Sequence, residues 1–296
     1  ATGHAIKGVA SQARLSFQRA LALDPNDTVA MNNLSFLETF FGRFVDGLDV
    51  ARRAFEVSGK AGNDYFHLSA PLISLRDDAL SRRWLAEAER RAAYDHRVQQ
   101  QLALVDVLLG RDSDAMARLA RAAAREPDDI EVTQTRSEVA FLVDSPEQEA
   151  LVAPLIETSA GTAGVWLAET PRVRYAHALA KRGETARAAR LVADAEGAAR
   201  ARIDGGDETP SWRVELAAIH ALKQDGQASL EALARAYDAG YREYGYLERD
   251  PIFTPLRTDE RFRALLDRMR RDVDTQRQAA RERGLLEIDA LLAPSR

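Results

Sequence analysis

A period of 34 residues runs through the first half of the chain and limits what the chain can fold into. Small residues recur at this spacing, and three further series share the same phase, at Ala20, Ala54, Ala88, Ala122; Ala13, Gly47, Ser81, Ala115; Ser35, Ser69, Ala103, Ser137; and Leu34, Leu68, Leu102. Small residues let two antiparallel helices approach closely, while the larger neighbours fill the space between them. A fixed period of this length therefore predicts stacked helical repeats.

Turn and stop signals follow the same period. Gly42 and Gly110 lie two periods apart, and Pro25 and Pro127 lie three periods apart. Glycine favours the left-handed backbone that ends a helix, and proline cannot continue one. Each repeat is therefore predicted to be a pair of helices, with a glycine turn inside the pair and a proline after it.

These residues resemble the tetratricopeptide repeat (TPR) family. The second-helix pattern of that family appears as Ala13, Phe17, Ala20, Pro25, again as Ala115, Leu119, Ala122, Pro127, and its first-helix pattern as Leu34, Ser35, Gly42, Phe44. The resemblance implies an all-α fold, a right-handed superhelical solenoid of antiparallel helix pairs. It also implies a concave groove lined by the first helix of each pair.

The period divides the chain into three regions. Residues 1–144 are predicted to form regular repeats, of which the first is incomplete because residues 1–8 are too few for its first helix. Residues 145–245 are predicted to form divergent pairs with longer helices, since Gly183 and Gly226 leave the register. We expect one continuous solenoid, with two separate domains as the alternative. An incomplete first repeat leaves an apolar end open, which predicts self-association there.

Residues 246–296 are predicted to cap the solenoid. Their opening resembles the end of TPR regions in bacterial multidomain signalling and regulatory proteins, on the residues Leu247, Asp250, Pro251, Phe253, Leu256, Arg257, Phe262, Leu265 and Leu266. The resemblance implies a region of a larger regulatory protein. Helical spacing further predicts that Phe262, Leu265, Leu266, Met269 and Val273 form one buried stripe.

Composition argues against several kinds of function. The chain has no cysteine, and its five histidines lack the spacing of a helical zinc site. Phosphate-binding loops and nucleophile motifs are absent, so we expect no enzyme, cofactor or metal. A net charge of -5 argues against nucleic-acid binding, and no apolar run is long enough for membrane insertion. The compartment stays open between cytoplasm, which is favoured, and periplasm.

The predicted function is a protein–protein interaction scaffold that binds a peptide or a partner protein in the concave groove. The groove positions carried over from the family are Asn32, Phe36, Phe40, Phe66, Arg97, Gln100, Leu104, Gln134, Glu138, His177, Lys181, His220 and Lys223. Phe36, Phe40 and Phe66 are expected to form an apolar anchor beside a polar rim. The alternative is a ligand-sensing module that controls an attached effector domain.

Overall fold

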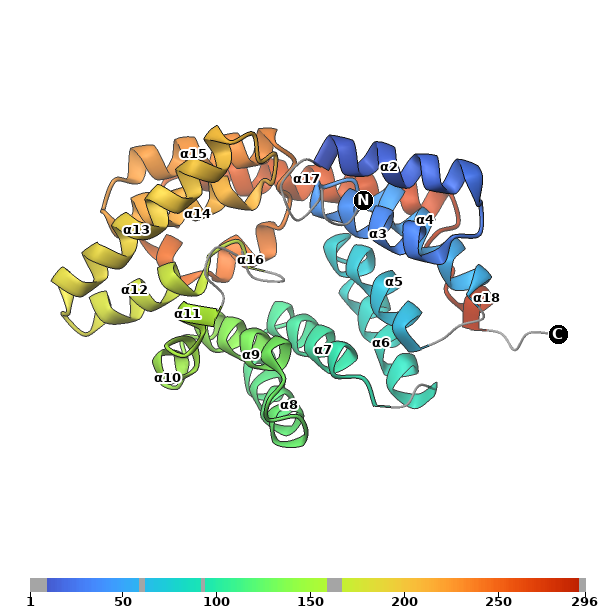
Figure 1. The fold of residues 1–296 in the computed structure, drawn as a ribbon, viewed down its shortest axis with the longest axis horizontal. Coiled ribbons are helices and arrows are strands. Elements are labelled where there is room, and N and C mark those ends of the chain that lie inside the picture. The colour runs from blue at the N-terminus through green and yellow to red at the C-terminus, as the bar shows by residue number, and fades with distance from the viewer. Residues whose placement is uncertain (1–9, 59–61, 92–93, 159–166, 293–296) are drawn as a thin grey trace. The chain divides into compact units, whose positions relative to one another are not determined.

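The computed structural model describes residues 10–58, 62–91, 94–158 and 167–292, and every regular element in these ranges is a helix (Figure 1). Successive helices form antiparallel pairs, which confirms the predicted all-α solenoid class. The handedness of the superhelix stays a prediction. Within the described ranges, no helix combines the length and the apolar character that crossing a membrane would require.

The chain forms two compact units. Unit 1 comprises Ala1–Val105 with Arg270–Arg296, and unit 2 comprises Asp106–Met269. The helices of unit 1 are α2 (Ala10–Leu23), α3 (Thr28–Phe40), α4 (Phe44–Val57), α5 (Gly62–Ser74), α6 (Asp78–Arg91), most of α7 (His96–Leu108), the second half of α17 (Glu260–Glu282), and α18 (Asp289–Leu292). In unit 1, α3 and α5 are first helices, and α4 and α6 are second helices.

Unit 2 holds the divergent pairs and the start of the C-terminal region. Its helices are α8 (Asp112–Arg125), α9 (Ile130–Leu142), α10 (Gln148–Val152), α11 (Leu155–Thr158), α12 (Pro171–Lys181), α13 (Thr185–Asp204), α14 (Ser211–Leu222), α15 (Gly226–Asp238), α16 (Tyr244–Arg249) and the 3₁₀ helix η1 (Pro251–Leu256), followed by the first half of α17. Here α9, α12 and α14 are first helices. The three-region division made from the sequence stays a prediction.

The 34-residue register is visible in the backbone. Gly42, Arg76, Gly110 and Asp144 all have positive φ, at 73°, 55°, 73° and 51°, and consecutive members are one period apart. Each ends a first helix or the turn after it. Arg76 holds the turn in the repeat that lacks a glycine, although a non-glycine residue adopts this conformation at a cost. Its guanidinium donates to both carboxylate oxygens of Asp78, at 3.0 Å each.

Small residues are needed where the helices of a pair touch. A Cβ atom on Gly47 of α4 would lie 2.4 Å from Thr39 Oγ1 and 3.0 Å from the Ser35 carbonyl oxygen. The Ser35 hydroxyl donates to the Gly47 carbonyl at 2.8 Å, and the Ser229 hydroxyl donates to the Ala217 carbonyl at the same distance. Gly47 and Ser35 belong to the small-residue series, which thus marks the helix contact, as predicted.

The first described helix, α2, packs like the second helix of a pair. Its Ala13 and Phe17 are buried against Leu34 and Leu37 of α3. Leu15 and Leu23, also on α2, are exposed large apolar residues. The prediction that the first repeat is incomplete concerns residues that lie outside the described ranges, and self-association stays a prediction.

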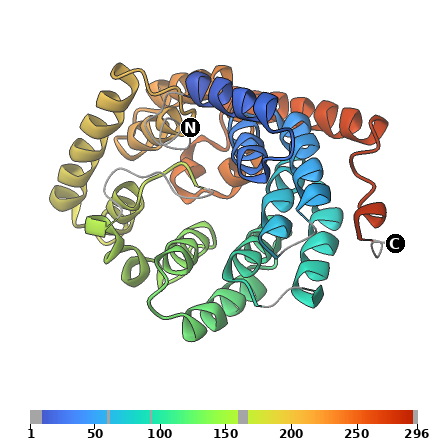
Figure 2. The same cartoon turned by 45° about the vertical axis from the view of Figure 1, so that its right-hand side comes forward.

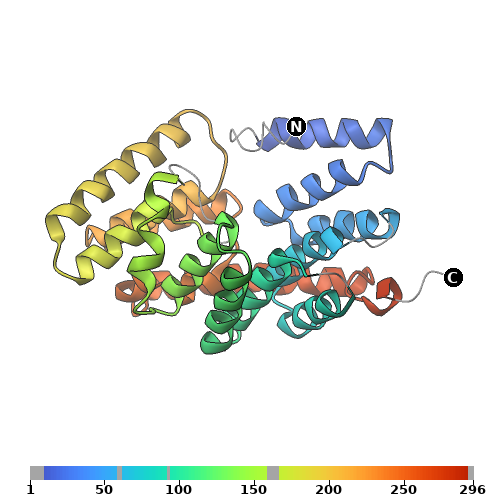
Figure 3. The ribbon, with the colours of Figure 1, turned by 60° about the horizontal axis from the view of Figure 1, so that its bottom comes forward.

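The predicted stripe of α17 is confirmed. Phe262, Leu266, Met269 and Val273 are buried, and Leu265 is half-buried. In unit 1, the end of α17 and α18 lie beside the second helices α4 and α6 (Figure 3), where Arg283 pairs with Asp49 at 2.6 Å. The C-terminal region therefore packs on N-terminal repeats.

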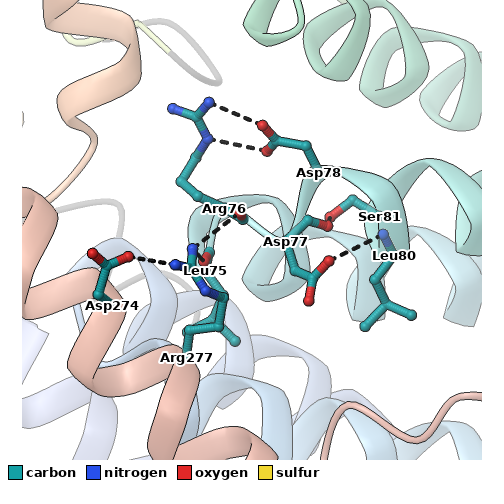
Figure 4. A network of polar contacts seen from close by, with 8 residues as sticks. All are labelled: Leu75, Arg76, Asp77, Asp78, Leu80, Ser81, Asp274 and Arg277. Atoms are coloured by element: carbon teal, nitrogen blue, oxygen red, sulfur yellow. Dashed lines mark hydrogen bonds and ion pairs between the residues drawn. The ribbon is translucent and has the colours of Figure 1, made fainter.

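The side chains of two consecutive residues of α17 bind the turns of two successive repeats. Gln276 accepts from the Phe44 amide at 2.7 Å and donates to the Gly42 carbonyl at 2.9 Å. Arg277 donates to the carbonyls of Leu75 and Arg76 at 3.2 and 3.1 Å (Figure 4). These carbonyls belong to helix ends and lack helical partners, so the contacts satisfy them.

Candidate functional site

The first-helix face of unit 1 carries exposed aromatic surface on α3. The Phe36 side chain is 47% exposed and stacks on Phe40, with ring centroids 6.0 Å apart and planes inclined by 17°. Val29, two helical turns before Phe36 on α3, is 68% exposed. Asn32 lies between them and is half-buried. We call Val29, Asn32, Phe36 and Phe40 the α3 stripe.

Phe66 lies apart from the α3 stripe in its ring contacts. It meets His67 edge to face, with centroids 5.2 Å apart, and the Arg97 guanidinium lies 5.4 Å from its ring centroid. Among the described residues no ring contact joins Phe66 to Phe36 or Phe40. The expected three-phenylalanine anchor is therefore two groups, one on α3 and one between α5 and α7.

Three expected groove positions have no open surface. Gln100 and Leu104 of α7 and Glu138 of α9 are buried, so the expectation that they face an open groove is wrong for these side chains. For Glu138 the reason lies in unit 2, where the first-helix face is covered. Gln134, one turn earlier on α9, is half-buried and donates to Glu138 at 3.4 Å.

The remaining expected positions lie along unit 2. His177 packs edge to face on Phe141, and burial, followed by the charge of Lys181, lowers the pKa of His177 to about 4. His177 is therefore neutral at pH 7. Lys181 is exposed and pairs with Asp144 at 2.5 Å. The structure also places His220 half-buried and Lys223 exposed, where Lys223 pairs with Glu196.

The covered face of unit 2 holds a buried cluster of ionisable side chains. Its members are Glu138, Glu169, Arg174, Glu215 and Asp250, and each is at most 2% exposed. They come from α9, the residues before α12, α12, α14 and the start of η1. Arg174 attracts all four carboxyl groups electrostatically. We call these five residues the buried cluster.

Two contacts set the protonation of the buried cluster. Glu169 and Asp250 share a hydrogen bond between their carboxyl groups, which requires a proton on one of them. Burial raises the pKa of both, and raises that of Asp250 well above its usual range. Burial also raises the pKa of Glu215 to about 8, although Glu215 accepts from the Thr170 amide at 2.6 Å and the Thr170 hydroxyl at 2.7 Å.

Arg174 is the least satisfied member of the buried cluster. None of its three guanidinium nitrogens has a hydrogen-bond partner in the described part of the chain, and burial lowers its pKa. A buried guanidinium without hydrogen bonds is costly, so its attraction to those of the four carboxyl groups that are ionised must offset part of that cost. The cluster can hold protons and position elements, while its burial keeps it from contact with a bound molecule.

Sequence reasoning identified Glu138 and Asp250 but missed Glu169, Arg174 and Glu215. A signal was present in the repeat register. Arg174 precedes the turn residue Gly183 by nine residues, and Glu215 precedes the turn residue Gln224 by nine. Arg174 and Glu215 therefore occupy equivalent positions on successive first helices.

Unit 2 also contains a pocket of about 370 Å³. It is lined by Asp112, Leu142, Val143, Asp144, Glu248, Arg249, Pro251, Thr254 and Arg257. Arg249 crosses one side of the pocket and donates to both oxygens of Asp112, at 2.6 and 2.7 Å. The lining mixes two guanidinium groups, three carboxylates and apolar side chains, which suits a small zwitterionic or amphipathic molecule.

Comparisons with known proteins give a general likeness. No family model matches the chain, and no curated protein does. A TPR protein from Parabacteroides merdae is 13% identical, with a TM-score of 0.48 over 85% of this chain and 94% of its own. YrrB, a TPR protein with an unusual peptide-binding site, is 15% identical, with a TM-score of 0.34 over 78% and 96%. IFIT1 with m7Gppp-AAAA is 12% identical, with a TM-score of 0.40 over 95% and 60%.

The helix pairs and the 34-residue register of positive-φ turns are properties of this chain itself.

Proposed function

We propose that the chain is an interaction scaffold and that it binds a peptide or partner protein on the first-helix face of unit 1. The α3 stripe carries this proposal. An exposed phenylalanine stacked on a second ring, with apolar and amide neighbours, has the composition of a binding hot spot with a polar rim. The Phe66–Arg97 pair on α5 and α7 extends the same kind of surface.

A peptide recovered from a displayed random library against the full chain provides the test. Phe36→Ala should weaken its binding about tenfold or more, because truncating a central aromatic anchor removes much of the binding free energy. Val57→Ala is the matched control, since Val57 is 41% exposed but lies on the second helix α4. His177→Ala tests unit 2 in the same assay.

Equal binding by the parent and the folded Phe36→Ala variant would exclude the α3 stripe as the site. A loss confined to His177→Ala would place the site in unit 2. Circular dichroism and thermal melting establish that each variant is folded.

The 370 Å³ pocket supports a second function, a ligand-sensing module in unit 2. A small molecule in this pocket would contact both the α9 turn and η1, and could bias how η1 docks. A metabolite screen by thermal shift tests this function, with Thr254→Trp filling the pocket. A shift that persists in Thr254→Trp would place the ligand elsewhere. The regulatory context suggested by the C-terminal residues also remains a proposal.

A further inference from the structure

The residues from Tyr244 to Leu256 cross the first helices of unit 2. We call this segment, α16 and η1 joined at Asp250, the strap. Its η1 packs against α14, and Leu256 reaches the start of α15, where its Cδ2 lies 3.2 Å from a Cβ placed on Gly226. At its other side Arg249 binds Asp112 of α8. Figures 1 and 2 show α16 on the inner side of α9, α12 and α14.

The strap therefore covers the face where a repeat of this type would hold a peptide. An extended or short helical segment laid across successive first helices is a recurring mode of peptide recognition. The strap contributes buried Leu247, Ile252 and Phe253 as apolar anchors, and buried Asp250 as a polar one. The strap thus lies on the first helices of unit 2 in the way that a bound peptide would.

The polar half of this contact is conditional. Asp250 accepts a hydrogen bond from the Ile252 amide at 2.8 Å, which caps the start of η1. Its carboxyl group also shares a hydrogen bond with Glu169, which holds η1 against the residues before α12. The second bond exists only while one of the two carboxyl groups is protonated. The charged or titratable groups that act on Asp250 are Glu169, Arg174, Tyr241 and Arg257, while Glu138 and Glu215 act on Arg174.

The packing around the strap is also incomplete. The 370 Å³ pocket is lined on one side by Glu248, Arg249, Pro251 and Thr254 of the strap, and on the other by the ends of α8 and α9. This pocket opens to solvent, so the strap residues that line it are not packed against the ends of α8 and α9 there. Both α16 and η1 are six residues long, too short to be stable by themselves.

We propose that the strap is a releasable internal ligand of unit 2, and that the first helices beneath it take in its place a peptide with a carboxylate side chain followed by proline and an aromatic residue. The proposal concerns unit 2 alone, so it is independent of the α3 stripe. Release exposes the face of α9, α12 and α14, and a competing peptide restores its contacts.

Hydrogen exchange of the full chain, followed by mass spectrometry, tests release directly. Amides of the strap should exchange about tenfold or more faster than those of α12 and α14, because local opening requires less free energy than global unfolding. Strap amides that exchange only at the rate of α12 and α14 would make the strap a permanent part of the core and overturn the proposal.

A labelled peptide with the sequence of residues 246–257 tests the binding face by fluorescence anisotropy. Asp250→Ala loosens the strap by removing the η1 cap and the Glu169 contact, so this variant should bind the peptide about tenfold more tightly than the parent. Asp259→Ala is the matched control, because Asp259 accepts from the Arg261 amide outside the strap. A folded Asp250→Ala variant that binds no better than the control overturns the proposal. If Asp250→Ala does not fold, the exchange measurement on the parent decides.

Phe36→Ala separates this proposal from the function proposed for unit 1. It should leave binding of the 246–257 peptide unchanged while weakening the library-selected peptide. Failure of one assay therefore leaves the other informative.

Discussion

Glu215→Gln should change how the stability of the protein depends on pH. Glu215 is buried on α14, and its pKa rises from an ordinary 4.5 to about 8. Because the folded state holds this proton to higher pH than the unfolded state, its contribution to stability is complete below about pH 4.5. That contribution is lost as the pH rises through about 8. Across this window the shift amounts to on the order of 5 kcal/mol.

Glutamine can keep both hydrogen bonds of this site. In the parent, the Thr170 amide and the Thr170 hydroxyl each donate to one carboxylate oxygen of Glu215. In the variant, the glutamine amide oxygen can accept from the Thr170 amide, and the glutamine amide nitrogen can donate to the Thr170 hydroxyl oxygen. The variant should therefore match the parent near pH 5. At pH 8 it should be more stable, by an amount that approaches the full shift.

Urea unfolding followed by circular dichroism, at intervals from pH 5 to pH 8, measures the difference between variant and parent. Other carboxylates change the stability in the opposite direction. For example, hydrogen bonds from Arg261 lower the pKa of Asp259 to about 2. Subtracting the parent removes their contribution. Glu231→Gln is the control, because Glu231 is exposed on α15. Parallel pH profiles for Glu215→Gln and the parent would refute the buried-proton argument.

Three further substitutions test the fold. Leu266→Asp should lower the melting temperature, since burying an unpaired carboxylate costs about 3 kcal/mol or more, and an unchanged melting curve would place the α17 stripe in solvent. Gln276→Ala should destabilise unit 1 by about 1–3 kcal/mol, because the Gly42 carbonyl and the Phe44 amide lose their partner. Gln278→Ala, at an exposed position, is the control, and equal urea midpoints for the two variants would contradict the prediction. Gly47→Ala should cost about 1–3 kcal/mol because its Cβ enters the contact with α3, and a melting temperature equal to that of the parent would show that the helices part freely.

The fold was largely predictable because its repeat acts through local rules. Glycine at positions 42 and 110 and small residues at the helix contacts follow from backbone geometry and close packing, which sequence displays directly. Arg76 and Asp144 were harder, since a non-glycine residue gives no sign that it adopts positive φ. The period still identifies them, because each lies one repeat from a glycine.

The groove was less predictable because exposure depends on elements distant in sequence. Phe36 and Lys181 are exposed as expected, while Glu138 is buried. Glu138 lies three periods after Phe36, so the register alone predicts the same exposure for both. Its burial comes with the covered first-helix face of unit 2, and no periodicity within residues 1–144 contains that information.

Two members of the buried cluster occupy a register position that is polar and buried in several repeats. Arg174 and Glu215 stand nine residues before their turns, and the same count back from Gly110 and Asp144 gives Gln101 and Thr135, which are also buried and polar. A polar side chain at this position has to find partners inside the repeat stack. Gln101 donates to the Phe66 carbonyl at 3.3 Å, and Glu215 accepts from Thr170. Arg174 has no such bond in the described residues, so it depends on attraction to those surrounding carboxyl groups that stay ionised. Loss of the strap would remove the carboxyl group that shares a proton with Glu169, which links the docking of residues 244–256 to the protonation of the buried cluster.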